Sequence, residues 1–141
     1  MWILSLILVL LVPQSDISDY RKAYESQDEA AILKHLDQLE SKKKLTNDEE
    51  CYYGAFLCLK AKFSNNPYTK YSSFTKGYKK LNSLITKESN VLEYRYHRFM
   101  VETKAPSFLI ENSHIEEDKA FILKNLKSSH PLFILINKTI D

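Results

Sequence analysis

The chain has 141 residues, of which 44% are hydrophobic and 27% charged, with a formal net charge of only +2. This length allows a single domain with a modest core. Two Gly and four Pro residues leave long unbroken stretches, which favours helices over sheets. Acidic and basic residues are interleaved, so the charge gives no reason to expect a nucleic-acid partner.

The chain begins with an apolar run, Trp2 to Val12, that only Ser5 interrupts. A transmembrane helix needs about 20 apolar residues, so this run is too short to span a membrane. It fits the apolar region of a secretory signal peptide, which predicts a signal peptide over residues 1–15 and an exported protein, periplasmic or secreted. Two alternatives remain: an uncleaved segment that anchors the protein to a membrane, and a terminal core helix.

Helix starts are marked by a capping residue followed three positions later by Glu, because the two side chains satisfy each other's free backbone amides. A Pro at the first helical position marks a start as well. The chain has six such starts: Ser26 with Glu29, Thr46 with Glu49, Asn90 with Glu93, Ser113 with Glu116, Asn66 before Pro67, and His130 before Pro131. Apolar residues between them recur at helical spacing, and no segment alternates like a strand. We therefore predict an all-α domain over residues 16–141 with about five to seven helices.

Two segments that lie 43 residues apart resemble each other, Asn47 to Cys58 and Asn90 to Val101. Asn, Glu, Tyr and Phe recur at equivalent positions, and a further predicted helix follows each copy. A repeat of two helices is typical of stacked antiparallel hairpins. We expect Tyr53 and Tyr96, which are equivalent in the repeat, to play the same role in one shared core.

Small residues form a stripe on the first of these helices: Cys51, Gly54, Ala55, Cys58 and Ala61. Small side chains let two helix backbones approach closely, so we expect this stripe to face the preceding or the following helix. The two cysteines are separated by about 10.5 Å along one helix and cannot form a disulfide with each other. We expect both to behave as small buried hydrophobes.

The densest group of polar and aromatic residues runs from Tyr94 to Arg98. Glu93 lies one helical turn from His97, and Arg98 one turn from Glu102, which predicts two surface ion pairs. An Arg beside an aromatic ring could instead bind an anion or stack on the ring. The histidines are scattered, and there is no Cys-x-x-Cys, Gly-rich phosphate loop or nucleophile motif. We therefore assign no catalytic, cofactor-binding or metal-binding residue.

The C-terminal segment from Leu132 to Ile136 is apolar on every side. It predicts a short terminal helix that covers the last hairpin, because an end repeat must hide its open face. The alternative is a docking segment for another subunit, since contiguous exposed apolar surface usually marks an interaction site.

The two matched helices, with Ala105-Pro106 after the second, resemble tetratricopeptide-like helical repeats, specifically the short exported helical-repeat proteins of bacteria. The likeness spans roughly Ser18 to Leu126. Tyr53-Gly54 together with Leu57 is similar to the large-Gly-x-x-large pattern of a tetratricopeptide first helix. The chain departs from that pattern in its longer period and in His97, which stands where the second Gly would be. The resemblance implies a helical superstructure and an interaction role, and it supplies no catalytic residue.

These observations predict a non-catalytic module that binds a protein partner at the cell envelope. Its candidate partner-binding residues lie on an expected exposed row of aromatic and Arg side chains, a composition typical of binding hot spots: Tyr52, Tyr94, Arg95 and Arg98. The alternative is a small-ligand-binding protein or an enzyme with a site between helices. Such a protein would have a deep pocket with converging polar groups and shifted pKa values.

Overall fold

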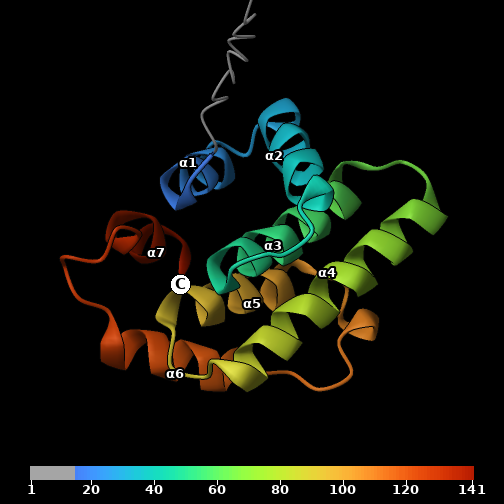
Figure 1. Cartoon of the computed structure of the whole chain (residues 1–141). Coiled ribbons are helices and arrows are strands. Elements are labelled where there is room, and N and C mark those ends of the chain that lie inside the picture. The colour runs from blue at the N-terminus through green and yellow to red at the C-terminus, as the bar shows by residue number, and fades with distance from the viewer. Residues whose placement is uncertain (1–14) are drawn as a thin grey trace, which may run out of the picture.

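The computed structural model describes residues 15–141, so the predicted signal segment lies outside the described residues except for Ser15. The described part contains seven α-helices and one 3-10 turn and no strand, which confirms the all-α prediction (Figure 1). The elements are α1 (Ile17–Ser26), α2 (Glu29–Ser41), α3 (Asn47–Phe63), α4 (Pro67–Lys87), α5 (Leu92–Lys104), η1 (Ser107–Leu109), α6 (Ile115–Asn125) and α7 (Phe133–Thr139).

A search of the described helices finds none with the length and apolar character needed to cross a membrane.

Two of the predicted helix starts form as expected, because the capping chemistry is local to a few residues. Thr46 and Glu49 make a reciprocal capping box at the start of α3. Asn66 accepts hydrogen bonds from two backbone amides of the first turn of α4, with Pro67 at the first helical position.

Other helix starts differ from the prediction. Ser26 still belongs to α1, where its hydroxyl donates to the carbonyl of Ala23, and Asp28 caps α2 instead. Helix α5 starts after Val91 without a side-chain cap, because Glu93 is directed toward α1. Helix α6 also has no side-chain cap bond.

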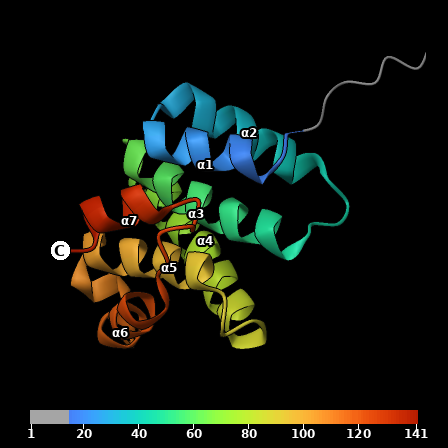
Figure 2. The same ribbon diagram turned by 90° about the vertical axis from the view of Figure 1, so that its left-hand side faces the viewer.

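Consecutive helices pack in pairs: α1 with α2, α3 with α4, and α5 with α6. Contacts of α3 with α2 and α5, and of α4 with α5, join the pairs into one stack. In two perpendicular views α1 and α2 lie on one side of α3, and α6 lies on the opposite side beyond α5 (Figures 1 and 2). The described chain is therefore a stack of helical hairpins.

Helix α7 returns to the core and lies beside α5 (Figure 2). Leu132, Ile136 and Ile140 are buried in the main hydrophobic cluster, which confirms the prediction that the C-terminal segment packs on the domain. Ile134, on the outer face of the same helix, stays exposed.

Helices α3 and α4 approach each other closely at a pair of glycines. A Cβ atom on Gly77 would lie 2.5 Å from the carbonyl oxygen of Gly54, and one on Gly54 would lie 2.9 Å from the carbonyl oxygen of Gly77. The two backbones are therefore too close for a side chain at either position. This confirms the predicted role of the small-residue stripe, which faces the following helix.

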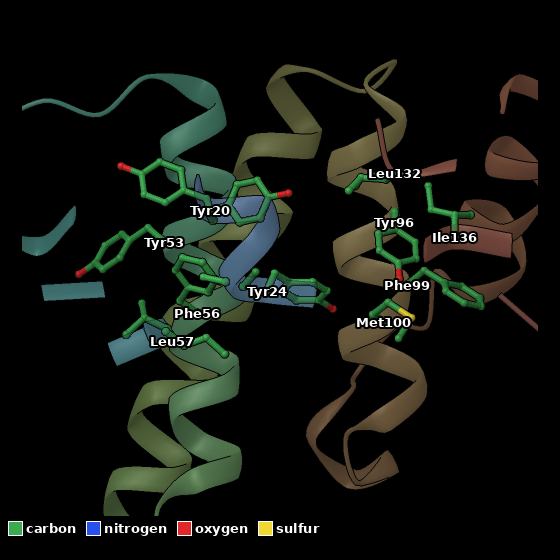
Figure 3. Packing of buried hydrophobic residues seen from close by; sticks show 14 of the residues in the cluster. Tyr20, Tyr24, Tyr53, Phe56, Leu57, Tyr96, Phe99, Met100, Leu132 and Ile136 are labelled. Carbon is green, nitrogen blue, oxygen red and sulfur yellow. The ribbon is translucent and has the colours of Figure 1, made fainter. Parts of the chain in front are cut away.

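Tyr53 and Tyr96 both belong to the main hydrophobic cluster, on α3 and α5 respectively (Figure 3). Their immediate surroundings differ. The Tyr53 ring lies under the ammonium groups of Lys76 and Lys80 of α4, at 5.4 and 4.9 Å from its centroid. The Tyr96 hydroxyl shares a 2.6 Å hydrogen bond with Thr139 of α7. The expectation that the two rings play the same role is therefore wrong in detail, because different helices cover the two copies.

Candidate binding groove

The four predicted partner-binding residues do not form an exposed row. None of Tyr52, Tyr94, Arg95 and Arg98 is more than 8% exposed, so this part of the prediction is wrong. The physical reason is the central position of α5, which contacts α3, α4 and α6 and is buried at every position from Leu92 to Met100.

The carboxylate of Glu93 connects α5 to two other helices. It accepts a 2.7 Å hydrogen bond from the Nη2 of Arg21 in α1 and a 2.9 Å bond from the hydroxyl of Tyr52 in α3. Burial, together with the neighbouring Glu93 charge, raises the pKa of Tyr52, so this hydroxyl stays protonated and donates. The expected surface ion pair between Glu93 and His97 does not form.

The two arginines bind one buried carboxylate, that of Asp118 in α6. Arg98 donates to it from Nε at 2.7 Å and from Nη2 at 2.8 Å, and Arg95 donates from Nη1 at 3.1 Å. The expected ion pair between Arg98 and Glu102 does not form within residues 15–141, and Glu102 accepts a 2.8 Å bond from the backbone amide of His114. Residues that resembled a surface patch in the sequence thus hold α5 to its neighbours.

A groove that the sequence analysis did not locate lies between the C-terminal halves of α3 and α5 and encloses a cavity of about 970 Å³. The ends of α1 and α7 border one side of it, and the start of α4 and η1 border the other. Its lining is mainly apolar, and Figure 3 shows the side chain of Tyr24 lying between α3 and α5, with Met100 on α5. The lining includes Tyr24, Ala55, Leu59, Phe74, Met100 and Leu135. We call this site the α3–α5 groove.

His97 is a polar residue in the inner wall of the α3–α5 groove. It is 1% exposed, and neither ring nitrogen has a hydrogen-bond partner among residues 15–141. Its ring lies edge to face with those of Tyr24 and Tyr52, at centroid distances of 4.5 and 4.8 Å. Burial lowers the pKa of His97 to about 4, so the imidazole is neutral near pH 7. A buried polar group without a partner costs about 1–3 kcal/mol, so a polar group in the groove would gain by bonding to His97 if the Tyr24 ring moved off the imidazole.

Lysines surround the α3–α5 groove. The lining contains four exposed lysines, none of which is ion-paired within the described part of the chain: Lys62, Lys70, Lys104 and Lys138. Glu25 is the one acidic residue in this lining as described. The mouth of the groove therefore carries positive charge.

Exposed aromatic rings extend the site beyond the groove. Tyr71 of α4 is 61% exposed and Phe108 of η1 is 84% exposed, and both line the α3–α5 groove. A second hollow of about 700 Å³ shares these two residues, and Phe74 and Leu109, with the groove. The two hollows are therefore neighbours, and residues of α4 and η1 line both of them.

Two signals in the sequence could have indicated this site. Lys70 lies in the first turn of α4, where a helix dipole disfavours a cation, so its position calls for another explanation. Phe108, Leu109 and Ile110 form a short apolar run in the connection after Pro106, and clustered apolar residues outside a helix can mark an interaction site. Neither signal shows which helices form the opposite wall, since that depends on long-range packing.

Potential metal ligands and thiols are the reactive groups to consider at this site. Among residues 15–141 no group of three or more His, Cys, Asp or Glu side chains is arranged to hold a metal ion. Burial raises the pKa of Cys58, a lining residue, to about 12, and that of Cys51 well above its usual value. Both thiols are therefore protonated and weakly nucleophilic near pH 7.

Comparisons with protein families, with curated proteins and with solved structures found no match to this chain. The interpretation of the groove therefore depends on its own residues.

Proposed function

We propose that the protein is an exported, non-catalytic helical-repeat module that binds a segment of another protein in the α3–α5 groove. The observation that carries this proposal is an apolar groove of about 970 Å³ with exposed aromatic rings at its mouth. Stacked helical hairpins commonly bind partners along such surfaces, and contiguous exposed apolar surface usually marks an interaction site. The export part of the proposal is supported by the apolar sequence of residues 1–15.

The exposed rings and the neighbouring hollow favour a protein segment over a small molecule. A site for a small ligand encloses most of that ligand's surface, whereas Tyr71 and Phe108 are 61% and 84% exposed and also line a second hollow. Aromatic residues are enriched at protein interfaces, so these two rings suit a protein partner.

A small amphipathic ligand is the second candidate, and His97 is the observation that favours it. Small-molecule sites are mostly apolar with a few polar groups that fix the orientation of the ligand, and His97 offers one such group in the inner wall. Native mass spectrometry of the purified protein, followed by solvent extraction, would detect a bound compound of this kind.

Site-specific photo-cross-linking in the native cell tests the proposed function. A photoreactive amino acid replaces Phe108 at the mouth of the groove, and a matched control replaces Leu123, which is 60% exposed on α6 and lies outside both hollows. We expect a discrete protein adduct from position 108 that position 123 does not give. Identical adducts from both positions, or no protein adduct from position 108, would refute the proposal.

The proposed export has its own test. Amino-terminal sequencing of the protein recovered outside the cytoplasm should find a new terminus near residue 15. An intact Met1 would refute cleavage, and recovery only from the cytoplasm would refute export.

A further inference from the structure

We infer that the segment that occupies the α3–α5 groove is an acidic amphipathic α-helix with an aromatic anchor residue. This inference rests on the proposed function and adds the chemical class of the partner. It follows from the size of the groove, from the charge at its mouth and from the unpaired imidazole in its wall.

The size of the groove is on the scale of a short helix. Two turns of helix are about 11 Å long and about 10 Å wide, and the groove has a volume of about 970 Å³. Two turns of an amphipathic helix present three or four apolar side chains on one face, at positions i, i+3, i+4 and i+7. The apolar walls that α3 and α5 provide suit this face, and the second hollow leaves room for the helix to continue.

The charge at the mouth selects for acidic residues on the remaining faces. Lys62, Lys104 and Lys138 lie in the last turns of α3, α5 and α7, where they also offset the negative ends of those helices. Lys70 has no such explanation, because it lies in the first turn of α4 beside the positive end of the helix dipole. Acidic side chains of a bound helix would meet this lysine and the others across the rim.

The imidazole of His97 selects the anchor residue. A neutral imidazole has one N–H donor and one acceptor nitrogen, and both are unpaired here among residues 15–141. Trp and Tyr combine a large apolar ring with a polar N–H or O–H group at the edge. Each nitrogen has less than 1 Å² of accessible surface, so an anchor of either kind that fills the space between the walls would hydrogen-bond to His97 once the Tyr24 ring, which lies edge to face with it, moves aside.

A selection from a random library of displayed 16-residue peptides tests the inference on the full described domain. We expect the enriched peptides to carry net negative charge, apolar residues at helical spacing and one Trp or Tyr. The binding of the best peptide is then measured by fluorescence anisotropy, with circular dichroism to confirm that each variant is folded. Dodecanoate serves as a small-ligand probe in parallel.

Matched variants locate the bound peptide and test its charge. We expect Lys70→Glu with Lys104→Glu to weaken binding at least tenfold, whereas Lys34→Glu with Lys44→Glu, on exposed residues in α2 and the following loop, changes it less than twofold. Ala105→Trp fills the mouth of the groove and should abolish binding, and Leu109→Trp, in η1, repeats the block at a second position.

The outcomes separate this inference from the proposed function. The acidic helix is overturned if the enriched peptides have no acidic bias, or if reversing the charge of the two groove lysines weakens peptide binding less than threefold. The proposed function survives either result if Ala105→Trp and Leu109→Trp still abolish binding. Unchanged binding in both blocked variants overturns the inference and the groove as the site. If the selection enriches no peptide, the inference is overturned. If dodecanoate then binds saturably to the unmodified protein and not to the two blocked variants, the groove is assigned to a small ligand.

Discussion

The substitution Asp118→Asn tests whether a buried ion triad holds α6 on α5. The Asp118 carboxylate is fully buried and accepts three hydrogen bonds from two arginines whose side chains are at most 10% exposed. Asn has nearly the same size, but it removes the negative charge and turns an amide N–H2 toward a guanidinium. Removing one partner of a buried ion pair costs about 3–5 kcal/mol, because the other charge stays buried and uncompensated.

Glu117 determines whether the loss of stability lies near the lower or the upper end of the range of about 3–5 kcal/mol. Its carboxylate lies 3.2 Å from the Nη1 of Arg95 and is largely exposed, so it compensates one of the two arginines in part. We therefore expect a loss near the lower end, about 3 kcal/mol. For a domain of this size a loss of that order lowers the Tm by about 10 °C.

Urea unfolding monitored by circular dichroism measures this loss of stability as a decrease in the urea concentration at the midpoint, with an unchanged m value. Glu117→Gln is the matched control, because the same kind of substitution at an exposed partner should cost less than about 1 kcal/mol. A loss below about 1 kcal/mol for Asp118→Asn as well would show that the triad does not stabilise the domain.

Three further predictions follow from buried residues. Gly77→Ala should destabilise the domain by about 1–3 kcal/mol despite the better helix propensity of Ala, because the new methyl group would overlap the Gly54 carbonyl. If urea unfolding shows equal or higher stability for the variant, the close contact is contradicted. Burial lowers the pKa of His97 from 6.5 to about 4, so between these two pH values the unfolded chain binds a proton that the folded chain does not. The free energy of unfolding should therefore fall by about 3 kcal/mol as the pH drops from 6.5 to 4. His97→Phe should remove that loss, so parallel stability profiles of the two proteins between pH 7 and 4 would refute it. Cys51 should react with a thiol reagent only after denaturation, and rapid labelling of Cys51 in the native protein would contradict its burial.

The features that could be predicted from the sequence are those that depend on neighbouring residues. The capping box of Thr46 and Glu49 and the start at Asn66 need only a few positions, and both form as expected. The small-residue stripe around Gly54 also indicated a close helix contact, because Gly in a helix interior needs a packing reason. These local signals were sufficient for the all-α fold.

The candidate site could not be predicted because α5 departs from the usual rule that charged residues face water. Glu93, Arg95 and Arg98 are buried because each finds a partner on another helix, and a partner such as Asp118 cannot be recognised from spacing along α5. The α3–α5 groove depends in the same way on how far two helices diverge. That divergence follows from packing across the whole domain.

The bond between Arg21 and Glu93 joins residues 72 positions apart and has a consequence for the order of assembly. When the chain emerges from the ribosome, α1 has no partner for its guanidinium until most of the domain has been synthesised. Contacts between residues so distant in the sequence form late, because a long loop must close first. We expect α3 and α4 to fold as an early nucleus and the bond between Arg21 and Glu93 to form in one of the last steps.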